Sequence, residues 1–135
     1  MGPNAEMMAP IEAVRRFMSS GDETGLAQAF VSDGVVILEN FPPFLFTGVQ
    51  AVAQWKEGFS SHARRHGLTE LESEFGEAQD FTLDGGSAFF TLPTRWRGLS
   101  HGRPFEESGG WAFVLARADG GWRIRSYAWA VTSKS

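Results

Sequence analysis

Residues 84–121 read DGGSAFFTLPTRWRGLSHGRPFEESGGWAFVLARADGG, and this stretch decides the fold. An Asp-Gly-Gly triplet stands at each end of it, which is a strong signal for a β-hairpin turn, and residues 100–104 form a weaker turn between them. These turns delimit four extended segments, at residues 69–83, 86–99, 103–117 and 121–132. We expect the four segments to pair as an antiparallel meander.

Glycine and proline inside these segments indicate that the sheet is bent. They occur at Gly76, Pro93, Gly109 and Gly110, and inside a strand such residues usually mark a bulge or a bend. Large apolar residues occur at both odd and even positions of the strands, and therefore on both faces of the sheet. We expect both faces to be covered. Helices would cover one face, and a second subunit would cover the other.

The residues before the meander carry helical periodicity. Apolar residues at helical spacing predict a first helix from about Pro10 to residue 18, a short second helix over residues 22–30, and a third over residues 49–66. A β-branched run at residues 35–39 predicts a short strand, which Pro42 and the proline after it prevent from continuing. Helices followed by antiparallel strands indicate the α+β class.

Length and composition limit the function classes. A chain of 135 residues has the length of one domain, residues 1–135, of which residues 1–9 are expected to be flexible or an addition to the natural chain. The net charge of −4 argues against nucleic-acid binding. There is no cysteine, no signal peptide and no apolar run of membrane-spanning length, so a cytoplasmic protein without disulfides is expected.

Three short motifs resemble a known superfamily. They are GDETGLAQAF at residues 21–30, FTGV at 46–49 leading into Ala53 and Trp55, and DGGWRI at 119–124. In these motifs and in the order of its elements, the chain resembles the nuclear-transport-factor-2-like superfamily, in its SnoaL-like and ketosteroid-isomerase-like branch. The resemblance implies a cone-shaped curved antiparallel sheet wrapped around a long helix, a pocket at the open end, and a homodimer through the outer sheet face.

The resemblance also implies a catalytic position. Ketosteroid isomerase-like members carry a general base at the end of the first strand; counting back from Gly48 places Glu39 there, whereas counting forward from Phe30 places Leu38 there. A carboxylate in apolar surroundings has a raised pKa and accepts a proton more readily. The alternative is that Glu39 only marks where the strand leaves for solvent.

The partner groups of a ketosteroid isomerase are missing. The resemblance implies a tyrosine on the first helix and an unionised aspartic acid on a later strand, but Val14 stands at the first position and Ala112 or Phe113 at the second. Ketosteroid isomerisation by that constellation is therefore excluded. Tyr127 and the five tryptophans are the remaining aromatic donors.

An aromatic segment follows Glu39, and its prolines stiffen the backbone. It predicts an apolar lip over a cavity, although the same phenylalanines could instead plug the end of the core. Tyr127 and Trp129 lie two residues apart on the predicted strand, so their side chains point to the same face. That face could be turned toward either the pocket or the dimer interface. The residues expected to bind a ligand are Asn40, Phe41, Phe44, Phe46, Trp55, Phe59, Trp96, Tyr127 and Trp129.

Two other motifs carry no site prediction. The GLSHG sequence at residues 98–102 matches a serine nucleophile elbow, but a strand follows it and no histidine lies beyond His101, so it predicts a hairpin turn. His62 and His66 have the spacing of metal ligands on a helix, but no third ligand is evident. No metal and no cofactor are predicted.

The sequence therefore predicts a SnoaL-like protein with an apolar pocket for a small, possibly cyclic molecule. Acid–base isomerase, cyclase or lyase chemistry would use Glu39 as general base. The alternative is a non-catalytic ligand-binding or dimerisation module.

Overall fold

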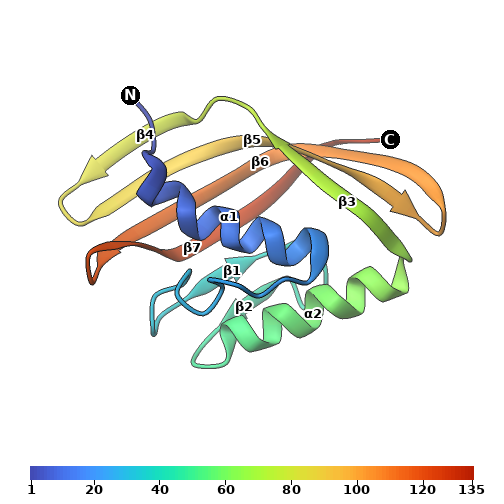
Figure 1. Cartoon of the computed structure of the whole chain (residues 1–135), viewed down its shortest axis with the longest axis horizontal. Helices are drawn as coiled ribbons and strands as arrows, with labels where there is room; N and C mark the ends of the chain where they lie inside the picture. The colour runs from blue at the N-terminus through green and yellow to red at the C-terminus, as the bar shows by residue number, and fades with distance from the viewer.

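The computed structural model describes residues 1–135, which fold into two helices and one curved seven-stranded sheet (Figure 1). The elements are α1 (Ala5–Ser20), β1 (Val36–Leu38), β2 (Leu45–Thr47), α2 (Ala51–Arg65), β3 (Leu68–Phe75), β4 (Gln79–Asp84), β5 (Ser87–Ser100), β6 (Arg103–Ala118) and β7 (Gly121–Lys134). The sheet wraps around α1, and α2 lies beside β1, β2 and β3. The predicted α+β class with a cone-shaped sheet is confirmed.

The long strands β5, β6 and β7 pair as the antiparallel meander that the Asp-Gly-Gly turns predicted. The predicted strand over residues 69–83 is two strands, β3 and β4, which both pair with β5. Regular pairing with β5 is interrupted between β3 and β4. At this interruption, the Gly76 N–H donates to the carbonyl oxygen of Pro93 at 2.7 Å. The bend expected at Gly76 and Pro93 therefore divides one strand into two.

The short strand β1 lies at the far side of the meander, parallel to β7 and antiparallel to β2. The sequence analysis did not predict β2, because Pro42 and Pro43 indicated a simple stop. The loop instead turns back on itself, since the Glu39 N–H donates to the Phe44 carbonyl at 2.9 Å and the Phe44 N–H donates to the Phe41 carbonyl at 2.8 Å. This tight loop brings the chain back antiparallel.

Two predictions about the first thirty residues were wrong. Residues 22–30 form turns and not a helix, because Gly25 adopts a left-handed conformation with φ of +77° in the middle of the segment. Helix α1 begins at Ala5, since the Asn4 side chain caps it by accepting from the Met7 N–H at 2.9 Å. Residues 5–9, expected to be flexible, are therefore helical, and Met7 is buried.

The core fills the cone from its closed end. Helix α1 buries one apolar face against β7 and β3, and its members are Met7, Ile11, Val14 and Phe17. From the sheet, Phe90, Phe113, Leu115 and Ile124 are fully buried in the same cluster. No helix of the structure is both long and apolar enough to span a membrane.

Candidate functional site

Glu39 follows β1 directly, and the tight loop after it holds its backbone. The residue is only 7% exposed. The Trp55 indole Nε1–H donates to Glu39 Oε2 at 3.1 Å, and the Tyr127 hydroxyl donates to the same oxygen. The donors come from α2 and β7, so two separate elements fix one carboxylate oxygen. The other oxygen has no partner from the protein.

Burial dominates the protonation behaviour of this group. The pKa of Glu39 is raised from its ordinary 4.5 to about 7, and loss of solvation is the largest cause of this rise. The bonds from Tyr127 and Trp55 lower the pKa, and the charge of Glu107 raises it. Burial, followed by the charge of Glu39, raises the pKa of the Tyr127 phenol well above its ordinary value. Tyr127 therefore stays protonated, and Glu39 exchanges a proton near neutral pH.

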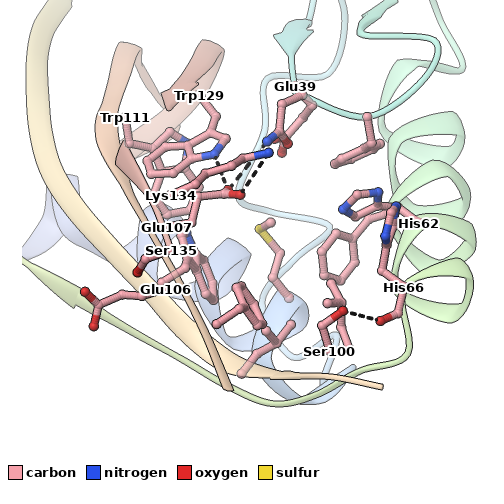
Figure 2. A pocket seen from close by; sticks show the side chains of 18 residues that line it. Glu39, His62, His66, Ser100, Glu106, Glu107, Trp111, Trp129, Lys134 and Ser135 are labelled. Carbon is pink, nitrogen blue, oxygen red and sulfur yellow. Dashed lines mark hydrogen bonds and ion pairs between the residues drawn. The ribbon is translucent and has the colours of Figure 1, made fainter. Parts of the chain in front are cut away.

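A cavity of about 370 Å³ opens beside Glu39, between the C-terminal half of α2 and the ends of β3, β5, β6 and β7. This volume lies near the lower end of the roughly 300–1,000 Å³ typical of small-molecule pockets. Figure 2 shows Glu107, Trp129 and Lys134 on the sheet side of the cavity, and His62 and His66 on the α2 side. The site thus lies at the open end of the cone.

The structure places the predicted ligand-binding residues in two groups. Those that line the cavity with Glu39 are Asn40, Phe41, Phe59, Trp96 and Trp129. Those that do not are Phe44, Phe46, Trp55 and Tyr127. Phe44 points to solvent with 57% exposure, whereas Phe46, Trp55 and Tyr127 are fully buried behind the cavity wall. Within the predicted aromatic lip, Phe41 faces the cavity.

Glu107 of β6 is a second carboxylate in this cavity, and the sequence analysis did not predict it as a site residue. Its Oε1 accepts from the Trp129 Nε1–H at 3.0 Å and from the Asn40 side chain at 3.5 Å, while Oε2 lies 3.8 Å from the Lys134 ammonium (Figure 2). Glu107 lies four residues before the buried Trp111, so both side chains point to the same face of β6. This spacing in the sequence indicates that Glu107 faces the inside of the cone.

His62 and His66 also line the cavity. Their ring centroids are 4.6 Å apart, and the His62 ring stacks on Phe41 at 5.2 Å. Burial, and secondarily the charge of His66, lowers the pKa of His62, so its imidazole is neutral at pH 7. No cluster of three or more histidine, cysteine, aspartate or glutamate side chains has the geometry of a metal site.

No family model matches the chain, and no curated protein is similar to it in sequence. Solved structures match it over nearly its whole length. A hexachlorocyclohexane dehydrochlorinase, LinA type 2, is 11% identical with a TM-score of 0.75, covering 97% of this chain and 86% of the other. An NTF2-like superfamily protein from Salmonella enterica is 15% identical with a TM-score of 0.75, covering 96% and 91%.

A candidate ketosteroid isomerase from Shewanella frigidimarina is 19% identical, with a TM-score of 0.72 and coverage of 94% of this chain and 96% of the other. Identities this low establish a shared fold and leave the chemistry to the site itself. The resemblance inferred from the three motifs is thus confirmed at the level of architecture. The chain has the cone-shaped α+β fold of the nuclear-transport-factor-2-like superfamily.

Proposed function

We propose that the protein catalyses an acid–base reaction on a small apolar, possibly cyclic molecule, with Glu39 transferring the proton. An isomerase, cyclase or lyase reaction fits this chemistry. One observation supports it above all: a carboxyl group with a pKa of about 7 lies on the wall of a cavity, with one oxygen held and the other free of protein partners. The solved dehydrochlorinase and the candidate isomerase show that this fold accommodates such reactions.

The fixed oxygen orients the group. Because Tyr127 and Trp55 hold Oε2 from behind the wall, the free oxygen is directed at the cavity, and the carboxylate loses little freedom when it meets a substrate. A positioned base or acid of this kind contributes on the order of 10²–10⁴-fold to a rate, and most when its pKa is near the working pH. Glu39 meets that condition at neutral pH.

The second candidate function is a non-catalytic binding module. It is favoured by the engagement of two of the cavity's donors, since the Trp129 indole and the Asn40 amide both donate to Glu107. A developing negative charge on a substrate oxygen would therefore find few donors aimed at it. The reaction test below separates the two functions.

A carbon acid that reports proton removal directly provides that test. In 5-nitrobenzisoxazole, removal of the C3 proton by the Glu39 carboxylate breaks the N–O bond and gives an absorbing cyanophenolate. We expect the protein to accelerate this ring opening at least about 100-fold over its Glu39→Gln variant. The rate should rise as the pH increases through about 7, because only the ionised carboxylate accepts the proton.

Glu72→Gln is the matched control, because Glu72 lies on β3 outside the cavity with a largely exposed side chain. Its rate should equal that of the wild type. Equal rates for the wild type and Glu39→Gln would contradict the catalytic proposal and favour the binding module.

A homodimer through the outer sheet face and a cytoplasmic location remain predictions. Phe89 supports the first, because it lies on β5 with 38% of its surface exposed while its neighbour Phe90 is fully buried inside the cone. Sedimentation equilibrium at micromolar concentration should show twice the 14.8 kDa mass of the chain. A species of 14.8 kDa alone would contradict the dimer.

A further inference from the structure

We propose that the ligand of this cavity is a cationic amine on an apolar ring, and that its ammonium group binds Glu107. This inference rests on the proposed function, because it names the substrate class of the same site. Three features of the cavity support it: the sign of its charges, the way its donors are occupied, and the chemistry of its walls.

Acidic groups outnumber basic ones in the cavity wall. The carboxyl groups of Glu39 and Glu107 line it, against one ammonium, that of Lys134, whereas the carboxylate of Glu106 lies 3.8 Å from the Arg95 guanidinium. His62 adds no positive charge at pH 7, because burial lowers its pKa. A cation that enters is therefore attracted, and a carboxylate is repelled, in a partly enclosed space where charges are weakly screened.

The donors nearest Glu107 are already engaged. The Trp129 indole and the Asn40 amide donate to Glu107, and the Ser100 hydroxyl donates to the His66 carbonyl at 2.8 Å. The Trp111 indole N–H has no partner, but it is enclosed in the wall. An anionic ligand placed beside Glu107 would therefore meet a carboxylate whose neighbouring donors are engaged, whereas a donor-bearing ligand meets an acceptor there.

The walls suit a cation as well. Aromatic rings surround the space beside Glu107, and those of Phe41, Phe59, Trp96 and Trp129 line it. The face of an aromatic ring attracts a cation, most strongly for tryptophan, and the attraction grows when water is excluded. The carboxylate and the rings act on the same charge, so the two effects reinforce each other.

An ammonium group already lies at this place. The Lys134 Nζ is 3.8 Å from Glu107 Oε2, although the Lys134 side chain is 65% exposed and the Glu107 side chain only 20%. An ion pair that holds one long, solvated side chain contributes little to stability. The ammonium of a ligand that also fills the apolar cavity can displace it, and Lys134 then swings into solvent.

Three probes of one shape test the charge preference: 3-phenylpropan-1-amine, 3-phenylpropan-1-ol and 3-phenylpropanoate. Their affinities are measured at pH 7.5 from the nitrogen-15 NMR shifts of the tryptophan indole N–H groups. We expect the amine to bind about tenfold tighter than the alcohol, and the propanoate to bind weakest. Glu107→Gln should remove the preference for the amine without changing the affinity for the alcohol, and Lys134→Met should strengthen amine binding.

Glu74→Gln, an exposed carboxylate on β3, is the control and should leave all three affinities unchanged. Equal affinities for amine and alcohol, or tighter binding of the propanoate, would overturn the inference. Either result leaves the proposed function in place if 5-nitrobenzisoxazole is still opened in a Glu39-dependent way. If none of the three probes shifts an indole signal, the amine inference fails, and ring opening at the rate of Glu39→Gln would show that the proposed function fails too.

Discussion

The two ends of the cone are built from the same strands but in opposite ways. At the closed end, Ile124 of β7 and Leu115 of β6 are fully buried in the hydrophobic core. At the open end, the same two strands present Trp129 and Glu107 to a cavity that also holds a nearly buried carboxyl group.

The difference shows where stability and function are separated in this fold. Close packing at the closed end removes apolar surface from water and stabilises the domain. The open end keeps an unfilled volume and a desolvated Glu39, both of which oppose folding. A small sheet protein can hold such a site because the rest of its core is fully packed.

The largest expected effect is on stability, and it comes from comparing one phenylalanine at the closed end with one at the open end. Phe90→Ala leaves a hole among Phe81, Phe113 and their neighbours, and should lower the free energy of unfolding by about 4 kcal/mol. Phe59→Ala should cost about 2 kcal/mol, because one side of that ring already borders the cavity. Urea denaturation measures both, and equal costs would contradict the division between the two ends.

The second prediction concerns the pH dependence of stability. Because folding raises the pKa of Glu39 from 4.5 to about 7, the folded state holds an extra proton in this range, and the associated stability is present below pH 4.5 and lost as the pH rises through about 7. The wild type should therefore lose about 3 kcal/mol relative to Glu39→Gln between pH 4.5 and 7.5. A constant difference between the two unfolding free energies would show that Glu39 is solvated.

The third prediction tests the bulge in β7 at the open end, where the β6–β7 register shifts between Ser108 and Gly109 and Thr132 of β7 is left out of the pairing. A Cβ on Gly109 would lie 2.0 Å from the backbone oxygen of Ala130, so Gly109→Ala should cost about 2 kcal/mol in urea denaturation. Gly110→Ala is the control, because its Cβ would meet only the Thr91 methyl group at 3.4 Å. Loss of stability in both variants alike would mean that the close approach is not the cause.

The smallest effect concerns the bonds that hold Glu39. Tyr127→Phe should raise the pKa of Glu39, because the lost hydrogen bond stabilises the carboxylate, and should cost about 1 kcal/mol of stability. Trp55→Phe should raise this pKa by less, since its bond lowers it less than that of Tyr127. Carbon-13 NMR of labelled glutamate, with Glu39→Gln to assign the signal, gives both values. A fall in either variant would be inconsistent with the observed donor geometry.

Much of the architecture could be predicted from short stretches. The Asp-Gly-Gly turns place the hairpins, and helical periodicity around Val14 and Trp55 places α1 and α2, because turn chemistry and periodicity depend on neighbouring residues. The wrong and the missing predictions also have local causes. Gly25 interrupts the segment predicted as a second helix, and the loop after Glu39 returns as β2 through backbone bonds that proline content does not reveal.

In the candidate site, too, one part could be predicted from the sequence and another part could not. By itself, the sequence determined the helices α1 and α2, the hairpins of the meander, and a carboxylate at the end of the first strand. Only the tertiary structure decided that Tyr127, 88 residues away, donates to that carboxylate, and that Glu107 joins Trp129 and Lys134 across the cavity. These contacts depend on the parallel register of β1 with β7 and on the register of β6 with β7, which shifts at a bulge in β7. No local pattern specifies these long-range pairings.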